Sequence, residues 1–471
     1  MKVRNIAVVL LFVISLAGCS SFRGNRVGSV NSDPWDTVKV ILKDIKAPEF
    51  PKRDFLVTSY GAVGDGKVNC SQAFKKAIEE CSKQGGGRVV VPPGNYFTGP
   101  IYIESNVNLH VQKGARILFS TNPDDYPIVF TRWEGIELMN YSPLIYSFEE
   151  KNIAITGEGI LDGQANETNW WPWKGQERYG YKKGTPSQVD KDKRAALFKM
   201  AEDGVPVEKR VFGKGFYLRP QFVQPYRCEN VLIEGVTVTN SPMWLLNPVL
   251  CNNVTIQKVT MESLGPNSDG CDPESCKNVL IKDCYFNTGD DCIAIKSGRN
   301  ADGRRINIPS ENIIIQGCRM ANGHGGVVIG SEISGGVRNV FAENCTMSSP
   351  ELDRALRIKT SSARGGVTEN IYMRNIEVGQ VAEQVFIATM FYEDKGNYMP
   401  TIRNIEVKNM RVKNGGKTGV LLEAYETSPI QNVRLINVTI DSVPTPYKFT
   451  NVKNVVFDDV KINGKKVELD K

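Results

Sequence analysis

Histidine is almost absent from this sequence, since its 471 residues include only two. So few imidazoles argue against a metal centre built from histidines, and the cysteines follow no paired zinc-ligand spacing. A strong charge of one sign is also missing, because 58 basic and 52 acidic residues leave a net charge of +6. Nucleic-acid binding calls for a clustered basic stripe, so we expect no nucleic-acid partner. A mildly basic chain can still bind an acidic substrate through a local patch of cations.

Long apolar runs are missing as well. Two basic residues precede Ile6–Ile14, whose nine apolar residues are too few for a membrane span of about 20, so a cleaved signal is expected. The following Leu16–Cys19 resembles the bacterial lipoprotein signal, in which the cysteine becomes the lipidated first residue. We predict a signal peptide over residues 1–18, a lipid anchor on Cys19 and a tether over 19–53. The protein would then lie in the bacterial cell envelope, in the periplasm or at the outer-membrane surface. The alternative is an ordinary signal with an incidental cysteine.

What the chain does contain is a repeat. A polar residue, an asparagine and an apolar residue recur together at Asn152, Asn230, Asn253, Asn278, Asn312, Asn339, Asn370, Asn404, Asn432 and Asn454. After a first step of 78 residues, these asparagines are 22 to 34 residues apart. Periods of 20–50 residues indicate a solenoid or array, and the units hold short alternating strands without helices between them. We predict an all-β parallel β-helix in which each repeat is one coil and the asparagine occupies the same corner of every coil.

The segment from about 69 to 84 has a helical pattern and precedes the repeats. Its apolar face comprises Ala73, Phe74, Ala77, Ile78 and Cys81. We predict that this helix caps the open end of the solenoid, because an uncovered strand edge invites aggregation. Residues 54–471 then form a single β-helix domain, with an insertion at about 164–217 inside the 78-residue step. This insertion is rich in tryptophan, and its aromatic side chains could stack on sugars, wall off one end of a groove or simply pack on one another.

Ten cysteines follow Cys19, at positions 70, 81, 228, 251, 271, 276, 284, 292, 318 and 345. Several recur at similar places in the repeat, which favours packing as small buried side chains. An exported protein can also form disulfides. Cys70–Cys81 and Cys271–Cys276 are two pairs that could be bridged, and the sequence leaves this open.

Four polar clusters interrupt the repeat at comparable points. They are Asn267-Ser268-Asp269-Gly270, Gly289-Asp290-Asp291-Cys292, Gly323-His324-Gly325-Gly326 and Arg357-Ile358-Lys359. Asp269 and Asp290 are 21 residues apart, and the next two steps, from Asp291 to His324 and from His324 to Arg357, are both 33. Each step is about one coil. We therefore predict that the clusters lie on neighbouring coils of one face and converge in a single pocket.

The residue types in these clusters suit the cleavage of an acidic sugar polymer. Three nearby carboxylates repel one another, so at least one should have a raised pKa. Glycosidic cleavage uses such a protonated carboxyl group beside an ionised one. Arg357 and Lys359 flank Ile358 and point to the same side of a strand, where two cations can hold an anionic sugar. Taken singly, each motif is an ordinary turn or a solvated strand, and their alignment coil by coil favours the site.

The ordered motifs Asn-x-Asp, Gly-Asp-Asp, Gly-His-Gly and Arg-Ile-Lys resemble the signature of glycoside hydrolase family 28, the polygalacturonases. The resemblance covers the chain from about residue 54 and implies a right-handed, pectin-lyase-like β-helix that hydrolyses with inversion and without a metal or other cofactor. It implies that Asp290 is the general acid and that Asp269 and Asp291 hold and activate water. His324 would support the acid and the substrate, and Arg357 and Lys359 would grip a galacturonate carboxylate.

The resemblance extends to residues beside these motifs. Asn267 would orient the site, while its neighbour Ser268 stands where many members have threonine. A tyrosine also contributes to the family's site, and Tyr392 is its candidate here. Members that cut rhamnogalacturonan tend to lack the histidine and the basic pair, so their presence favours a polygalacturonate-type substrate.

We therefore expect hydrolysis of α-1,4-galacturonosidic bonds in an acidic pectic polysaccharide or oligosaccharide. The stretch from Asn267 to Pro273 and the run after Lys296 are similar to exo-acting bacterial members, which favours release of short units from a chain end. Three alternatives stay open. They are hydrolysis of rhamnogalacturonan or xylogalacturonan, elimination by a calcium-dependent pectate lyase, and a β-helical adhesin without enzymatic activity. We expect a monomer that contacts the membrane only through Cys19.

Overall fold

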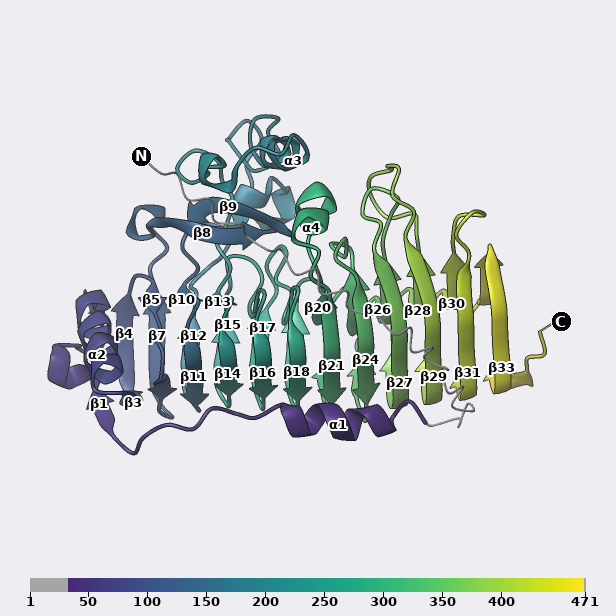
Figure 1. Ribbon diagram of the computed structural model, residues 1–471, viewed down its shortest axis with the longest axis horizontal. Helices are drawn as coiled ribbons and strands as arrows, with labels where there is room; N and C mark the ends of the chain where they lie inside the picture. The colour runs from purple at the N-terminus through teal and green to yellow at the C-terminus, as the bar shows by residue number, and fades with distance from the viewer. Residues whose placement is uncertain (1–32, 470–471) are drawn as a thin grey trace, which may run out of the picture.

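The computed structural model describes residues 33–469, whose strands stack in parallel into one long solenoid (Figure 1). Successive coils are in register, so that Val231 of β14 (Glu229–Glu234) lies beside Val254 of β16 (Asn252–Gln257). Both side chains are buried and belong to one continuous apolar core. Columns of identical or similar side chains stacked in this way stabilise the fold, because each coil buries the apolar face of its neighbours. The predicted all-β parallel β-helix is confirmed.

The strands form three faces. The first face comprises β1 (Asp54–Leu56), β3 (Gly87–Val91), β6 (Val107–Val111), β11 (Lys151–Gly157), β14, β16, β18 (Lys277–Lys282), β21 (Ser310–Gln316) and β24 (Val337–Glu343). The second comprises β2 (Asp65–Asn69), β4 (Gly94–Thr98), β7 (Ala115–Phe119), β12 (Ile160–Asp162), β15 (Thr237–Thr239), β17 (Thr260–Ser263), β19 (Tyr285–Thr288), β22 (Arg319–Met320) and β25 (Thr346–Ser348). Both continue in the long strands β27 (Val367–Gln380), β29 (Thr401–Asn414), β31 (Ile430–Ile440) and β33 (Val452–Ile462), and β34 (Lys465–Lys466) ends the sheet.

The third face is shorter and carries the candidate site along one edge. It comprises β5 (Ile101–Tyr102), β10 (Ile145–Phe148), β13 (Val223–Tyr226), β20 (Ile293–Ile295), β23 (Val327–Gly330), β26 (Arg354–Lys359), β28 (Gln384–Thr389), β30 (Thr418–Glu423) and β32 (Thr445–Thr450). Isolated parallel bridges link the strands β5, β10 and β13 to the strands that begin with β20, so that they form one face.

The recurrent asparagines form a ladder at one corner of the solenoid. Nδ2 of Asn230 donates to Oδ1 of Asn152 at 2.9 Å, and the same contact joins each successive asparagine from Asn278 to Asn454. All ten have φ between 54° and 61°, the left-handed region that asparagine tolerates better than most residues. The predicted position of this residue in every coil is confirmed.

Helix α2 (Ser71–Lys83) covers the N-terminal end of the solenoid (Figure 1). It contacts β1, β3 and β5 of the first coils. Its buried residues are Ala73, Phe74, Ala77, Ile78 and Cys81, the five that the sequence pattern predicts. The capping helix is therefore confirmed.

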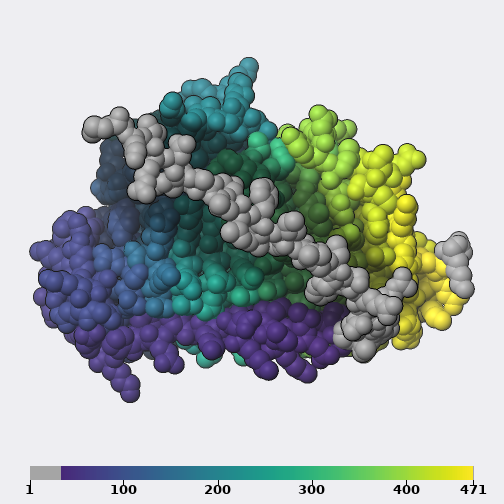
Figure 2. Space-filling model, viewed as in Figure 1, coloured from purple at the N-terminus to yellow at the C-terminus, as the bar shows by residue number. Residues whose placement is uncertain are grey.

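Residues 33–50, which we call the N-terminal strap, differ from the predicted tether. They include helix α1 (Asp36–Asp44), which lies along the side of the solenoid opposite the insertion (Figures 1 and 2). Trp35, Val38 and Ile41 are buried against the outer surface of β21 and β24. A tether over 19–53 is thus wrong for this part of the chain, because the short helix has one apolar side that the solenoid covers.

The strap also joins the asparagine ladder. The Lys46 N–H donates to Oδ1 of Asn253 at 3.0 Å, and Nδ2 of Asn253 donates to the Lys46 carbonyl oxygen at 2.9 Å. The predicted signal peptide and Cys19 lie outside the described residues. Between residues 33 and 469, no helix has both the length and the apolar character needed to cross a membrane.

The insertion at 164–217 folds onto an antiparallel hairpin, β8 (Ile128–Trp133) and β9 (Ile136–Tyr141), which the sequence analysis did not predict. The short helices of this region and its surroundings are η2 (Pro123–Asp125), η3 (Trp171–Lys174), η4 (Glu177–Tyr179), α3 (Arg194–Glu202), η5 (Val207–Lys209) and α4 (Asn300–Ile306), whereas η1 (Val57–Tyr60) lies beside the capping helix α2. Helix α3 and the hairpin share a second apolar cluster that includes Trp133, Leu197 and Trp244. Insertion and hairpin together stand above the third face (Figure 1).

The ten cysteines of the described chain are all buried and all free, which agrees with packing. Neither of the two pairs that could have been bridged forms a disulfide. Stacking of coils brings thiols together instead, as where the Cys228 N–H donates to Sγ of Cys251 at 3.4 Å.

Candidate active site

The candidate site lies where the chain passes from the second face to the third. Asp269 follows β17, Asp290 and Asp291 connect β19 to β20, and His324 precedes β23. The strands that follow these turns are in register, because Ile293 pairs with Val327 and Val327 pairs with Leu356. Stacking of the coils thereby places polar turns that are remote in sequence beside one another.

The three predicted carboxylates meet at this edge. One oxygen from each of Asp269, Asp290 and Asp291 lies within 4.8 Å of the others. Asp291 is fully buried and accepts from Lys359 Nζ at 2.7 Å and from Arg357 Nη1 at 3.3 Å. The basic pair of the Arg-Ile-Lys motif therefore neutralises one of the three aspartates in the structure.

His324 pairs with Asp290. Nδ1 of His324 lies 2.9 Å from Oδ1 of Asp290, and this hydrogen bond together with the Asp290 charge raises the pKa of His324 to about 9. Burial opposes ionisation of Asp290, but the hydrogen bond from His324 and the charges of His324 and Lys359 hold the pKa of Asp290 below its ordinary value. Near neutral pH the two side chains form an ion pair.

Asp269 and the neighbouring Asp272 are buried carboxyl groups whose pKa values lie well above their ordinary value. Burial, together with the neighbouring carboxyl groups of Asp272 and Asp290, holds the pKa of Asp269 well above its ordinary value. The expectation that one of the clustered carboxyl groups has a raised pKa is met. The family resemblance implies that Asp290 is the acid, and in the structure without substrate the pKa of Asp290 is lowered while that of Asp269 is raised. The physical reason is the protonated His324, which stabilises the charged form of Asp290.

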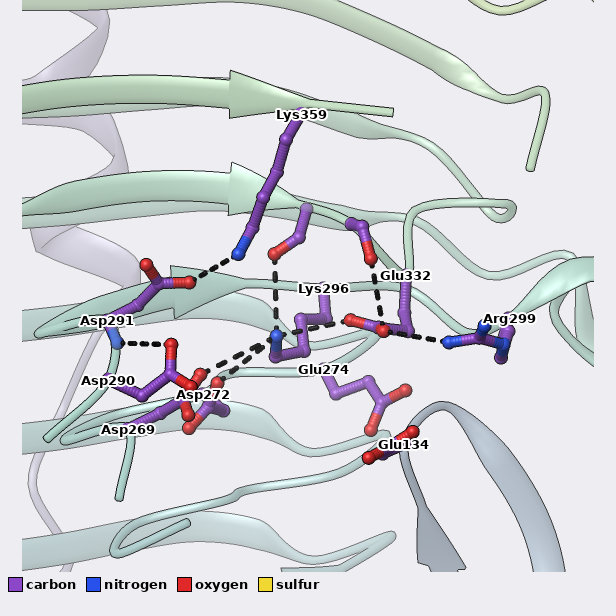
Figure 3. A network of polar contacts seen from close by, with 12 residues as sticks. Glu134, Asp269, Asp272, Glu274, Asp290, Asp291, Lys296, Arg299, Glu332 and Lys359 are labelled. Carbon is purple, nitrogen blue, oxygen red and sulfur yellow. Dashed lines mark hydrogen bonds and ion pairs between the residues drawn. The ribbon is translucent and has the colours of Figure 1, made fainter. Parts of the chain in front are cut away.

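A buried lysine that the motifs do not include lies beneath these aspartates (Figure 3). Lys296 Nζ lies 3.2 Å from Glu332 Oε2, 3.5 Å from Asp272 Oδ1 and 3.8 Å from Asp269 Oδ2. Burial disfavours its charge, yet Glu332 and the two aspartates hold the pKa of Lys296 well above its ordinary value. Glu332 in turn accepts from Arg299 at 3.2 Å. This network fixes a positive charge directly next to Asp269.

These side chains border a cavity of about 210 Å³. Six of the seven predicted site residues line it, namely Asn267, Asp269, Asp290, His324, Arg357 and Lys359, and Asp291 lies directly behind them. Tyr392 also lines the cavity, and its ring centroid lies 5.4 Å from the Arg357 guanidinium and 5.2 Å from Lys359 Nζ. The structure thus brings together all the predicted residues and places the candidate tyrosine with them.

The opposite wall of the cavity comes from the insertion and the hairpin. It includes Glu134 at the hairpin turn, Lys174 at the end of η3 and Arg194 at the start of α3. Arg194 Nε donates to Glu134 Oε2 at 2.7 Å. None of the tryptophans of the insertion lines the cavity in the described structure, because Trp170, Trp171 and Trp173 pack within the protein.

A family model described as "Glycosyl hydrolases family 28" matches residues 213–462, which include every motif of the site. The chain belongs to glycoside hydrolase family 28. A second model, described as "Rhamnogalacturonase A/epimerase, pectate lyase-like", matches residues 55–111 at the N-terminal end of this family 28 fold.

Solved structures and curated relatives agree with this membership. An exopolygalacturonase from Thermotoga maritima is 46% identical, with a TM-score of 0.90 over 92% of this chain and 97% of that one. A probable polygalacturonase of Vitis vinifera is 28% identical over 85% of this chain and 77% of its own. An exo-poly-α-D-galacturonosidase of Dickeya chrysanthemi is 27% identical over 85% of this chain and 74% of its own. The chain is thus a glycoside hydrolase with the predicted right-handed β-helix.

Sequence reasoning missed several residues of this family 28 site. Lys296 could have been found, since it directly follows the third-face strand β20, much as Lys359 is the last residue of β26. Lys174, Arg194 and Arg219 belong to the insertion or its end, where no repeat predicts which residue reaches the cavity. A metal is also conceivable on the three aspartates, which offer oxygen ligands. Lys359, Lys296 and His324 already balance their charge, so the site needs no cation for neutrality.

Proposed function

We propose that this family 28 hydrolase cleaves α-1,4-galacturonosidic bonds of polygalacturonate and acts from a chain end. One observation carries this proposal: Asp269, Asp290 and the cations Arg357 and Lys359 line one cavity that the insertion walls off, with Asp291 directly behind them. Carboxylates supply the acid and base of glycoside hydrolysis, and cations beside them suit a substrate with a carboxylate on every unit. The exopolygalacturonase of Thermotoga maritima and the exo-poly-α-D-galacturonosidase of Dickeya chrysanthemi, to which the chain is similar, support the same assignment.

We infer the following sequence of proton transfers. The carboxylates of the substrate neutralise Lys359 and Lys174, two of the cations that depress the pKa of Asp290, so the pKa of Asp290 rises when substrate binds. The proton on Asp269 then passes to Asp290, which donates it to the leaving glycosidic oxygen. Asp269 is left ionised and, with Asp291, takes a proton from the attacking water. His324 keeps its own proton and its hydrogen bond to Asp290 throughout.

Inversion at the anomeric carbon is part of this proposal. Inverting glycosidases usually place their two carboxyl groups about 6.5–9.5 Å apart, with the attacking water between acid and base. Here the nearest oxygens lie within 4.8 Å, so the water must bind beside Asp269 and Asp291 on the far side of the sugar from the leaving oxygen. Proton NMR of the first product distinguishes inversion from retention, because inversion releases the β-anomer and retention releases the α-anomer.

Product analysis tests both the substrate and the exo mode. We expect polygalacturonate to yield one short product from the earliest time points, while the average chain length of the remaining polymer falls slowly. Early release of mixed oligomers would instead show endo cleavage. Preferential degradation of rhamnogalacturonan or xylogalacturonan would indicate another pectic substrate. A chelator-sensitive rise in ultraviolet absorbance would reveal an unsaturated product and hence a lyase, and an unchanged polymer would leave the adhesin alternative.

We also propose that the protein is a lipoprotein of the bacterial cell envelope, anchored through Cys19 and monomeric. The apolar run Ile6–Ile14 and the Leu-Ala-Gly-Cys sequence that follows it support this location. Expression of the full chain with Cys19→Ser should move the activity from the membrane fraction to the soluble fraction. Equal membrane association of the variant and the unaltered chain would contradict the anchor.

A further inference from the structure

The cations of the cavity differ in whether they already have an anionic partner. Arg357 and Lys359 contact Asp291, Lys296 contacts Glu332, and Arg194 contacts Glu134. Lys174 is the exception: within the part of the chain that the structure describes, no carboxylate lies within ion-pair distance of its ammonium group.

Lys174 Nζ instead donates to Asn267 Oδ1 at 2.7 Å, and this amide oxygen carries no charge. Burial lowers the pKa of Lys174, and the nearby Glu134 and Asp290 partly offset this effect. A largely buried ammonium without an anionic partner costs free energy. A ligand anion in the cavity would remove this cost.

Lys174 lies close enough to Asp290, the proposed general acid, for its charge to act on that carboxyl group. The positive charges of Lys359 and Lys174 both act on Asp290, and these two lysines come from different parts of the chain. Lys359 belongs to β26 of the solenoid, whereas Lys174 ends η3 of the insertion. The reacting bond of polygalacturonate joins two units that each bear a carboxylate, so a site for this bond has to accommodate two anions.

We propose that Lys174 binds the carboxylate of the galacturonate unit on the insertion side of the scissile bond, while Arg357 and Lys359 serve the unit on the other side. This inference rests on the proposed function and makes Lys174 a specificity determinant for uronates over neutral sugars. The unit bound by Lys174 is the one next to the wall formed by Glu134 and Arg194, and therefore the terminal unit of an exo-acting enzyme.

The tryptophan-rich sequence before Lys174 has a role in this arrangement. Trp170 is buried, and its ring centroid lies 4.8 Å from that of Trp173 in edge-to-face contact. Trp173 makes a second such contact with Tyr217 at 5.3 Å, and Trp171 Nε1 donates to the Ser241 carbonyl oxygen at 3.0 Å. These contacts hold η3 in place, so that the lysine at its end is presented at a fixed position. Preorganised charges of this kind bind their ligands with little cost of ordering.

The test compares Lys174→Met and Lys174→Arg with Lys183→Met, which removes an exposed lysine of the same insertion. The substrates are trigalacturonate and its trimethyl ester. Loss of one charge-assisted contact should lower kcat/KM on trigalacturonate about 10- to 100-fold in Lys174→Met, mainly through KM. Activity on the ester should change less than about threefold, because the ester carries no carboxylate. Lys174→Arg should recover most of the loss, and Lys183→Met should match the unaltered enzyme on both substrates.

The opposing results are equally definite. An equal loss of activity on both substrates in Lys174→Met would mean that Lys174 merely supports Asn267. No loss on either substrate would mean that Lys174 contacts no substrate. Either result would overturn the inference and leave the proposed function intact. Failure of the unaltered enzyme to cleave trigalacturonate would overturn the proposed function and this inference with it. Should Lys174→Met fail to fold, Lys174→Gln, which keeps a hydrogen-bond donor toward Asn267, serves as the second neutral variant with the same expected ratio.

Discussion

Arg219 donates a hydrogen bond of 2.8 Å from Nη2 to Oδ1 of Asn267, although 48 residues separate them in the chain. Nη1 of the same guanidinium donates to the carbonyl oxygens of Pro242 and Pro266, at 2.7 and 2.6 Å. The side chain is fully buried, and this burial lowers the pKa of Arg219 to about 10. One guanidinium thereby ties the end of the insertion to the turn that carries Asn267 and Asp269.

Replacement of Arg219 should therefore affect both stability and activity. Arg219→Met leaves the buried carbonyl oxygens of Pro242 and Pro266 without this donor and removes one of the two donors to Asn267 Oδ1, so we expect the free energy of unfolding to fall by about 3 kcal/mol. We expect kcat to fall more than about tenfold, because Asn267 loses its position. Arg219→Lys should recover little, since an ammonium cannot reproduce the guanidinium fork. Urea titration and steady-state kinetics measure the two effects. Unaltered kcat in a folded Arg219→Met variant would contradict the positioning role.

Asp269 and Asp291 should differ in their contribution to stability. Asp291→Asn leaves Lys359 and Arg357 without their buried partner, which should cost about 3–5 kcal/mol of unfolding free energy. The raised pKa of Asp269 favours its uncharged form, so Asp269→Asn should change stability by less than about 1 kcal/mol. Both variants should lose at least about 10²-fold in kcat if the proposed roles are correct. Urea titrations of the two variants at pH 7 give the comparison, and equal destabilisation would place a charge on Asp269 after all.

The ion pair between His324 and Asp290 should make stability depend on pH. The pKa of His324 is about 9 in the folded protein and 6.5 in the reference state, so the contribution of the pair is complete below pH 6.5 and is lost as the pH rises through 9. Thermal unfolding should show the largest Tm difference between the unaltered enzyme and His324→Gln at pH 6, shrinking to near zero by pH 10. A difference that stays constant over this range would exclude the ion pair.

His110 provides the matched control for this measurement. Burial lowers its pKa, and Nδ1 lies 2.8 Å from Thr156 Oγ1. Its folded-state pKa therefore lies below the unfolded value, and protonation of His110 opposes folding only below pH 6.5. The Tm difference for His110→Gln should stay flat between pH 6.5 and 9.

The N-terminal strap should detach without loss of activity when Trp35 is removed. The Trp35 ring lies 5.5 Å from that of Phe341, and the Arg374 guanidinium lies 3.9 Å from its centroid. Trp35→Ala removes a docking contribution of about 3 kcal/mol, so hydrogen exchange should accelerate over residues 33–46. Activity should stay unchanged, because the strap lies on the side of the solenoid opposite the insertion (Figure 1), and the insertion forms one wall of the cavity. Val40→Ala, at an exposed position of α1, should leave exchange unaltered.

Local sequence patterns were sufficient for much of the fold. The apolar spacing of α2 and the recurrent asparagines both indicate contacts that depend only on the sequence of one element or one coil. The same regularity placed the four catalytic motifs on one face, since residues one coil apart must lie side by side. Patterns failed where the chain departs from the repeat: at hairpin β8–β9, at the strap that packs on β21 and β24, and at the insertion.

The amino-acid sequence alone determined that this chain is a stack of parallel coils and that its aspartates, His324 and the basic pair converge, because a periodic chain translates sequence spacing directly into spatial proximity. Only the tertiary structure decided which aspartates have a raised or a lowered pKa and which cation of the insertion enters the cavity. Those outcomes depend on burial and on distances between residues that no common period relates, such as Lys174 and Asn267 or Lys296 and Glu332.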